Sequence, residues 1–322
     1  MKSTLRCLIL AIVLPGASTT AAAGGPPVLI REQAGPRPAT VLDRLWIWTH
    51  PVGAHDGLDL GDGRKAKSRM TPVAGADFLG LSNLYFIHYP NNPPPAEFPA
   101  YALAFRPMRR VVLSLTGAGG DTSPEGRQTM IRLAREHPNV VGFVLDDFLH
   151  WGADSAREAA DTTSPVPAPL SPAQLREIRH ALSTGGRPLP VTCVIYTHQI
   201  SPRILPHVNE IDRVAIWTWR SDDLKDLEAN LERLERIVRP RPILLGCYLY
   251  DYGAGRPMSV ERMKRQCELG LKWLQEGRIE GMIFLASNVC DLGLPSVQWT
   301  RDWIRSVKDQ AVPDLPDSAT AR

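Results

Sequence analysis

The stretch Val140-Val-Gly-Phe-Val-Leu-Asp-Asp-Phe-Leu-His-Trp151 runs from apolar residues directly into two adjacent carboxylates. A continuous apolar run of this kind is typical of a strand that is buried on both faces of a parallel sheet. In such sheets, ligands bind at the carboxyl ends of the strands. The sequence therefore predicts that Asp146 and Asp147 lie where a ligand would bind. The alternative is that they cap the next element or pair with an arginine.

Seven further apolar runs of the same kind occur along the chain. They cover residues 45–50, 80–88, 111–116, 190–198, 213–219, 242–252 and 281–287. Between most of them, apolar side chains recur at spacings of three and four, most regularly over residues 224–238 and 260–274, which predicts amphipathic helices. Ser171 and Ser259 are the predicted N-caps of two of these helices.

Eight buried strands that alternate with helices over about 265 residues predict a single (β/α)8 TIM barrel of class α/β. A doubly wound open sheet is the alternative, but no G-x-G-x-x-G turn follows the first strand. The glycine-rich residues 117–120 lack the lysine of a phosphate-binding loop, so we interpret them as a tight turn. The barrel is expected over residues 44–311, between a linker at 24–43 and a disordered tail at 312–322.

The first 23 residues have the pattern of a secretory signal peptide. Lys2 and Arg6 give the first residues a positive charge, residues 8–14 are apolar, and Ala21-Ala-Ala23 offers a cleavage site. The apolar run is too short to be a convincing membrane span. We therefore expect a secreted or periplasmic protein without a membrane partner.

Charge and cysteine usage narrow the function classes. The net charge of +3 has mixed signs along the chain, which argues against a nucleic-acid partner. No C-x-x-C pair occurs, so a zinc site is not expected. An exported chain could form one disulfide among Cys247, Cys267 and Cys290, and buried thiols, as for Cys193, are the alternative.

Aromatic residues gather at the predicted strand ends, where more than half of the 22 Phe, Trp and Tyr residues fall. Large rings with polar tips suit a polyhydroxylated ring ligand, because ring faces stack on CH groups while the tips form hydrogen bonds. The candidate substrate-binding residues are Trp48, His50, Tyr85, His88, His150, Trp151, Tyr196, His198, Trp217, Trp219, Tyr250 and Asn288. Residues 54–62, which include His55, do not match a calcium loop and are interpreted as a solvated turn.

The acids at the predicted strand ends are Asp146, Asp147 and Asp251, and these are the candidate catalytic residues. In an eight-stranded ring the fourth and seventh strands lie nearly opposite each other. Two carboxylates on opposite walls could flank a glycosidic bond, one protonating the leaving oxygen and the other attacking or activating water. This chemistry requires neither a metal nor a cofactor, and its partner is a carbohydrate.

Gly142-Phe-Val-Leu-Asp-Asp-Phe148 resembles the G-[IV]-x-[FL]-D-D-[YF] strand of several glycoside-hydrolase-like TIM-barrel families. Residues 111–120 are loosely similar to the third strand of chitinase-type barrels. The resemblance implies a glycosidase-like fold and a carbohydrate-active protein. The chain departs from the chitinase pattern because no glutamate follows the fourth strand. It also has aspartate where the major glycosidase barrels carry glutamate on strands four and seven.

Two other functions stay open. A barrel that binds glycan without cleaving it fits the replacement of glutamate by aspartate, since a fold alone does not prove chemistry. A metal-dependent hydrolase could use His50, His88, His150 and His198, which all fall near strand ends. The H-x-H pattern that amidohydrolase barrels carry on the first strand is absent here.

Overall fold

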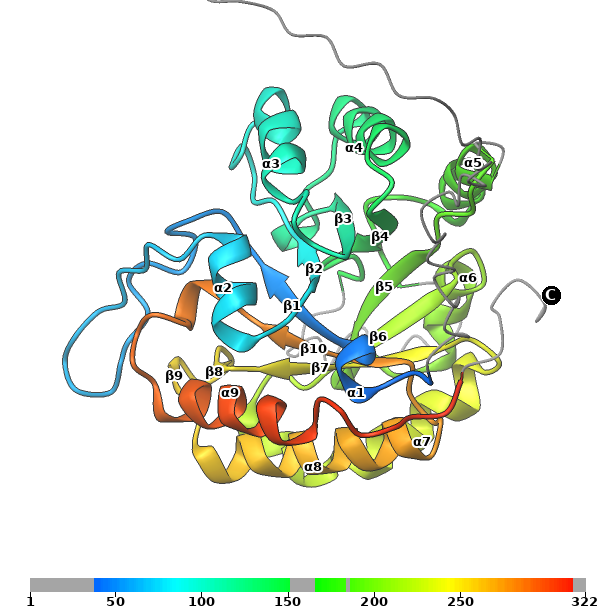
Figure 1. Cartoon of the computed structure of the whole chain (residues 1–322). Helices are drawn as coiled ribbons and strands as arrows, with labels where there is room; N and C mark the ends of the chain where they lie inside the picture. The colour runs from blue at the N-terminus through cyan, green and yellow to red at the C-terminus, as the bar shows by residue number, and fades with distance from the viewer. Residues whose placement is uncertain (1–37, 151–165, 184–185, 315–322) are drawn as a thin grey trace, which may run out of the picture. The chain divides into compact units, whose positions relative to one another are not determined.

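Eight parallel strands form a closed barrel in the computed structural model, which describes residues 38–150, 166–183 and 186–314. The barrel strands are β1 (Leu45–Thr49), β2 (Asn83–Phe86), β3 (Arg110–Thr116), β4 (Val140–Leu145), β5 (Val191–Tyr196), β6 (Arg213–Trp217), β7 (Ile243–Tyr248) and β10 (Gly281–Leu285). Their order around the barrel is β1-β10-β7-β6-β5-β4-β3-β2 (Figure 1). Because β1 pairs with both β2 and β10, the sheet has no open edge. The predicted TIM barrel is confirmed, and the open-sheet alternative is wrong.

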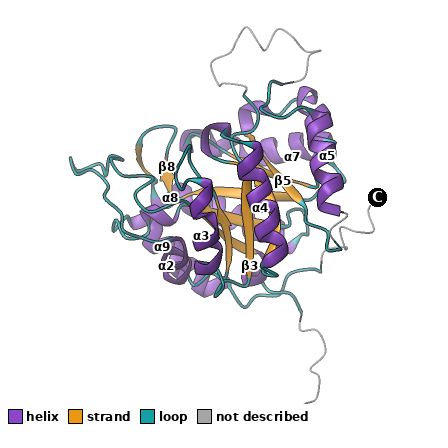
Figure 2. Cartoon of the chain, turned by 90° about the horizontal axis from the view of Figure 1, so that it is seen from above, coloured by secondary structure: helices purple, strands orange, loops and turns teal. Residues whose placement is uncertain are grey.

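Helices surround the strands (Figure 2). They are α1 (Val41–Arg44), α2 (Pro72–Leu79), α3 (Phe98–Ala104), α4 (Pro124–Glu136), α5 (Pro172–Ser183), α6 (Leu205–Val208), α7 (Leu227–Val238), α8 (Val260–Gln275) and α9 (Pro295–Val307). Both predicted N-caps are confirmed: the Ser259 side chain accepts a hydrogen bond from the Arg262 N–H, and Ser171 Oγ accepts one from the Gln174 N–H. In the described part of the chain, no helix is both long and apolar enough to cross a membrane.

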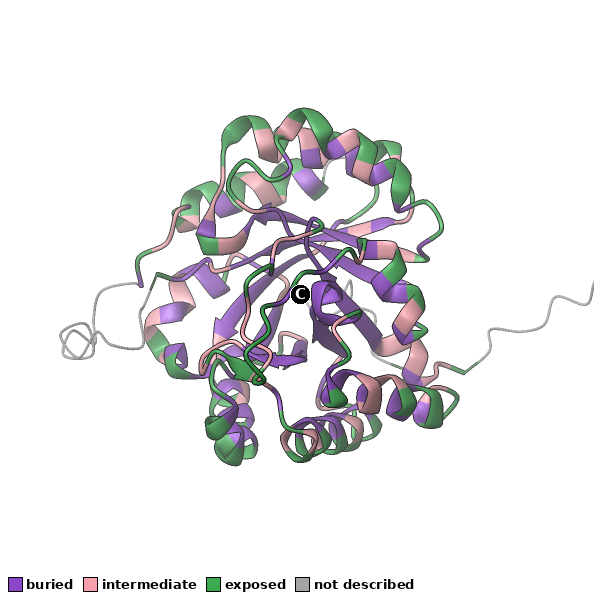
Figure 3. Cartoon of the chain, turned by 90° about the vertical axis from the view of Figure 1, so that its left-hand side faces the viewer, coloured by how far each residue is buried: buried purple, intermediate pink, exposed green. Residues whose placement is uncertain are grey.

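The barrel strands are buried along almost their whole length (Figure 3). Helices cover their outer side and side chains fill the interior, so continuous apolar runs are what such strands require. Gly246 of β7 lacks a side chain for a packing reason. A Cβ atom at Gly246 of β7 would lie 2.0 Å from Cδ2 of Trp217 on β6, so glycine leaves the space that this indole occupies.

The two ends of the described chain pack against each other. The N–H of Val41 donates to the carbonyl of Gln310 at 2.9 Å, and the N–H of Val312 donates to the carbonyl of Ala39 at 3.0 Å. Val41 and Val312 are buried, although the sequence assigned them to the linker and the tail. The packed unit therefore begins before the predicted start at residue 44 and includes Val312, one residue beyond the predicted end. The predicted signal peptide lies outside the described residues.

The four cysteines of the described chain are free and buried. They are Cys193, Cys247, Cys267 and Cys290. The disulfide considered for the last three is therefore not formed, and the buried-thiol alternative holds. Burial raises the pKa of each of these thiols.

Candidate functional site at the carboxyl ends of the strands

A cavity of about 110 Å³ lies at the carboxyl ends of the barrel strands. It is lined by Trp48, His50, His55, Tyr89, Ala118, Asp146, Asp147, Val194, Tyr196, Trp217, Trp219, Tyr248, Tyr252 and Leu285. Every barrel strand, or the loop that follows it, contributes at least one of these residues. The volume is below the roughly 300–1,000 Å³ of typical ligand pockets, so the cavity suits one small ring rather than a long chain.

Asp146 follows β4 directly and lies against β3. Its N–H donates to the Thr116 carbonyl at 3.1 Å, and the Thr116 hydroxyl donates to the Asp146 carbonyl at 3.0 Å. The residue is only 6% exposed. Burial, assisted by the nearby charge of Asp147, raises the pKa of Asp146 well above its ordinary value. A carboxyl group in such surroundings keeps its proton at a pH where an exposed one has lost it.

Asp147 is held in an uncommon backbone conformation. Its φ of 42° lies in the left-handed region, which residues other than glycine seldom adopt. Its Oδ1 accepts a hydrogen bond from the Tyr196 hydroxyl at 2.5 Å, and its Oδ2 accepts one from the Gly119 N–H at 2.8 Å. Backbone strain of this kind tends to occur at functional sites, where the surrounding structure enforces it. The turn therefore gives the Asp147 carboxylate a fixed direction.

Two histidines form one side of the cavity. His55 Nε2 lies 3.1 Å from the Tyr89 hydroxyl, and its Nδ1 lies 2.9 Å from the Tyr252 hydroxyl. His50 Nδ1 lies 3.2 Å from the Ile87 carbonyl, which can only accept, so this nitrogen carries the hydrogen. Burial lowers the pKa of His55 to about 4, and burial together with His55 lowers the pKa of His50 well below its ordinary value. Both rings are thus neutral at pH 7.

An aromatic wall runs from the barrel interior to the mouth of the cavity. The ring centroids of Trp48 and Trp217 are 5.2 Å apart, and those of Trp217 and Tyr248 are 4.9 Å apart. Tyr248 in turn lies 5.3 Å from Tyr252 and 5.9 Å from Trp219, which is 40% exposed. Among the described residues, the buried indole N–H groups of Trp48 and Trp217 have no hydrogen-bond partner. These two N–H groups are enclosed by protein atoms.

The cavity brings together seven of the candidates named from the sequence. They are Trp48, His50, Asp146, Asp147, Tyr196, Trp217 and Trp219. His198 lies beside this group, since its ring stacks on Tyr196 with centroids 5.6 Å apart. His150 is exposed and does not line the cavity, and Trp151 lies outside the described residues.

Four other candidates have buried roles away from the cavity. Tyr85 stacks beneath Trp48, with ring centroids 5.7 Å apart. His88 Nδ1 lies 2.7 Å from the Ser114 hydroxyl. The Tyr250 hydroxyl donates to the Asp59 carbonyl at 2.9 Å, and Asn288 Nδ2 donates to the Pro51 carbonyl at 2.9 Å. Each of these polar side chains already has a partner within the protein.

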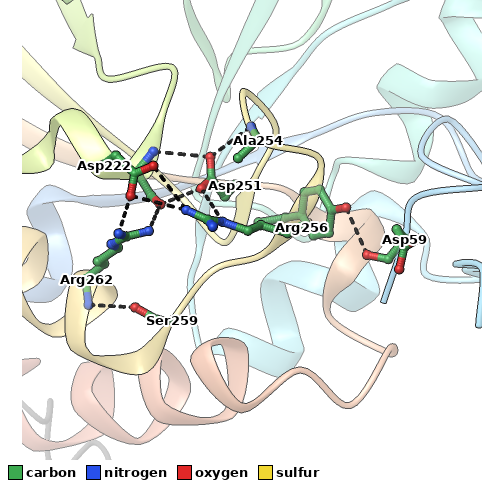
Figure 4. A network of polar contacts seen from close by, with 9 residues as sticks. Asp59, Asp222, Asp251, Ala254, Arg256, Ser259 and Arg262 are labelled. Atoms are coloured by element: carbon green, nitrogen blue, oxygen red, sulfur yellow. Dashed lines mark hydrogen bonds and ion pairs between the residues drawn. The ribbon is translucent and has the colours of Figure 1, made fainter. Parts of the chain in front are cut away.

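Asp251 does not line the cavity either. It belongs to a short antiparallel hairpin of β8 (Tyr250–Asp251) and β9 (Arg256–Pro257) that follows β7. Its carboxylate is 1% exposed. It accepts hydrogen bonds from the Ser221 N–H at 3.1 Å, the Ser221 hydroxyl, the Ala254 N–H at 3.2 Å and Arg256 Nε at 3.4 Å (Figure 4). The geometry therefore gives no support to the hypothesis that Asp251 flanks a bond opposite Asp146 and Asp147.

Seven lining residues were not among the candidate site residues, and the four polar ones are His55, Tyr89, Tyr248 and Tyr252. The three tyrosines belong to or directly follow predicted strands, so their position was a usable signal. The interpretation of His55 as part of a solvated turn is wrong, because the residue is only 7% exposed. Nothing in its polar surroundings in the sequence indicates burial.

The described residues contain no group of three or more His, Cys, Asp or Glu side chains suited to hold a metal ion. The four histidines considered for a metal site do not all line the cavity: His50 does, whereas His88, His150 and His198 do not. The metal-hydrolase alternative gains no support from the described part of the chain.

No protein-family model and no curated protein matches this chain. Similar solved structures include a xylanase-α-amylase inhibitor protein in complex with trehalose, at 12% identity and a TM-score of 0.47, covering 80% of this chain and 96% of that one. A chitinase catalytic domain from Pyrococcus furiosus has 12% identity, a TM-score of 0.44 and coverages of 74% and 83%. A tryptophan synthase complex from the same organism has 10% identity, a TM-score of 0.43 and coverages of 82% and 97%.

The three proteins differ in function, and likenesses this distant carry no argument about chemistry. The closed sheet itself establishes the architecture. The chain folds as a (β/α)8 TIM barrel.

Proposed function

We propose that this protein hydrolyses glycosidic bonds, with Asp146 as the proton donor. The observation that carries the proposal is a carboxyl group with a raised pKa beside a second, oriented carboxylate in an aromatic-walled cavity at the strand ends. A buried acid beside a second carboxylate is the arrangement that glycoside hydrolysis uses.

The chemistry assigns different roles to the two aspartates. Asp146 would give its proton to the leaving glycosidic oxygen as the bond from that oxygen to the anomeric carbon breaks. Asp147, held by Tyr196 and Gly119, would stabilise the positive charge that develops on the sugar ring. Water would then attack the anomeric carbon and return a proton to Asp146.

Reducing-end release from a panel of polysaccharides tests this proposal. We expect Asp146→Asn and Asp147→Asn to lower the rate of release by about 10²–10⁴-fold, the usual contribution of a positioned acid or an electrostatic group. Asp302→Asn is the control, because this α9 carboxylate is 63% exposed and outside the cavity. Full activity of Asp146→Asn would refute the assigned role, and loss of release in EDTA would favour a metal-dependent hydrolase.

A glycan-binding barrel without activity is the second candidate. It is favoured by one observation: both carboxylates among the described lining residues come from the end of one strand, with no third acid across the cavity. In that case calorimetry would detect sugar binding by a protein that releases no reducing ends, and Asp146→Asn would leave this binding largely unchanged.

A further inference from the structure

The cavity contains negative charge without a basic side chain to balance it. Its described lining includes Asp146 and Asp147 but neither lysine nor arginine. The two lining histidines are neutral at pH 7 because burial lowers their pKa values. Both hydrogen bonds that Asp147 accepts from described residues come from uncharged donors, the Tyr196 hydroxyl and the Gly119 N–H. Asp147 is partly buried, and a carboxylate withdrawn from water is usually paired with a cation.

The cavity is also unusually rich in ring faces. Its seven aromatic rings are those of Trp48, Tyr89, Tyr196, Trp217, Trp219, Tyr248 and Tyr252. Aromatic faces attract cations, and cages of such rings are the common way to bind a substituted ammonium group. The cation–π contacts found among described residues lie elsewhere, namely Arg110 over Trp46, Arg278 over Trp273 and Arg301 over Phe78. None of these three arginines lies over a ring that lines the cavity.

We propose that the cavity selects a cationic ligand, an amine-bearing sugar ring, over neutral and anionic sugars. The ammonium group pairs with Asp147 and lies against the ring faces, so its positive charge neutralises the carboxylate. A carboxylated sugar would instead meet the Asp147 carboxylate and the negative faces of the rings. The choice of a sugar rests on the proposed function, whereas the choice of a cation rests on the cavity itself.

Calorimetric titration with four matched monosaccharides tests this inference: glucosamine, glucose, N-acetylglucosamine and glucuronate. N-acetylglucosamine is the sharpest control, because it keeps the nitrogen and loses the charge. We expect glucosamine to bind at least tenfold more tightly than either neutral sugar at pH 7, and glucuronate to show no binding. In Asp147→Asn the ratio of glucosamine to glucose affinity should fall to about one, and Asp302→Asn should behave as the unchanged protein does.

Equal affinity for glucosamine and glucose, or tighter binding of N-acetylglucosamine, would overturn the inference. If no monosaccharide binds, the same comparison is made with hexasaccharides of glucosamine and of N-acetylglucosamine, and a lack of preference or of binding there overturns it as well. A preference for the amine in a protein that cleaves no polysaccharide would sustain this inference and refute only the hydrolase. Cleavage of a polysaccharide without a preference for the amine would support the hydrolase and refute this inference.

Discussion

Asp146 is a buried carboxyl group that directly follows β4. Its pKa is raised in the folded chain, so the folded state binds the proton more tightly than the unfolded state does. The stability that this proton contributes is fully present below the ordinary value of 3.8 and is lost as the pH rises through the raised pKa. The native protein is therefore destabilised by deprotonation at the cavity.

This linkage predicts how Asp146→Asn changes stability with pH. The asparagine variant should gain stability relative to the native protein from about pH 4 upward, by at most about 1.4 kcal/mol per pH unit, and the difference should level off above the raised pKa. Urea unfolding between pH 4 and pH 9 measures it. A difference that stays constant across this range would contradict the raised pKa.

Asp43→Asn is the comparison variant, because the pKa of Asp43 is lowered in the folded protein whereas that of Asp146 is raised. Burial tends to raise the pKa of Asp43, but hydrogen bonds from the Thr40 N–H, the Arg109 guanidinium and the Thr40 hydroxyl outweigh it and lower the pKa to about 2. This carboxylate contributes stability above pH 4 that is lost as the pH falls towards 2. The cost of Asp43→Asn should therefore shrink on acidification, whereas Asp146→Asn should gain no advantage there.

At the residue scale, the only signal that predicted cavity residues from the sequence was their position at the end of a strand. Asp146 and Trp217 could be predicted because a residue at the end of a barrel strand faces the ligand-binding side. His55 could not, because it follows no strand closely and its burial depends on contacts with Tyr89 and Tyr252. Side-chain pairing across distant loops leaves no periodic trace in the sequence.

The β8–β9 hairpin is the element that completes one wall of the cavity. Asp251 fastens it to the segment after β6 through Ser221, and the Gly253 N–H donates to the Trp219 carbonyl at 3.2 Å. The hairpin also carries Tyr252, which lines the cavity. Figure 4 shows Arg256 directed at both Asp251 and Asp222, so the fastening is shared among several groups.

Asp251→Asn should therefore loosen the cavity wall without removing a reacting group. We expect KM for the best polysaccharide to rise several-fold with a smaller change in kcat, and the free energy of unfolding to fall by about 1–3 kcal/mol because buried donors lose their charged acceptor. Ser221→Ala, which removes one of the donors, should give a milder change of the same kind. If turnover instead fell by about two orders of magnitude while KM stayed unchanged, Asp251 would be a reacting carboxylate.

At the element scale, the eight strands and most helices could be predicted because apolar runs and three-four spacing are local patterns. The direction of Asp251 could not be predicted. Strands covered on both faces are apolar throughout, so alternation does not reveal which side chains point inwards. The short hairpin that turns Asp251 away from the cavity has only two residues in each strand and gives no pattern at all.

The whole described chain is held together without a disulfide among its four buried thiols. We expect the thermal unfolding midpoint to be the same with and without a reducing agent. In the native protein these cysteines should react with a thiol reagent only as fast as the chain opens, because each is buried and its pKa is raised. Scanning calorimetry and thiol titration measure both expectations. A lower midpoint under reduction would show that a disulfide stabilises the protein.

At the scale of the whole molecule, the sequence predicted the number of strands and the closure of the barrel but not where the packed unit ends. Val41 and Val312 belong to segments of polar or proline-rich composition, which predicted a linker and a tail. They are nevertheless buried, because backbone hydrogen bonds join the two chain ends. Contacts between the first and last residues of a domain cannot be read from either segment alone.

The missing side chain at Gly246 has a consequence for evolutionary comparison. The indole of Trp217 fills the space above this glycine, so a larger residue at one position requires a smaller one at the other. Substitutions at the two positions should therefore covary among descendants of a common ancestor. Glycine on the seventh barrel strand together with tryptophan at the end of the sixth would mark the lineage that shares this cavity, even where the aspartates have changed.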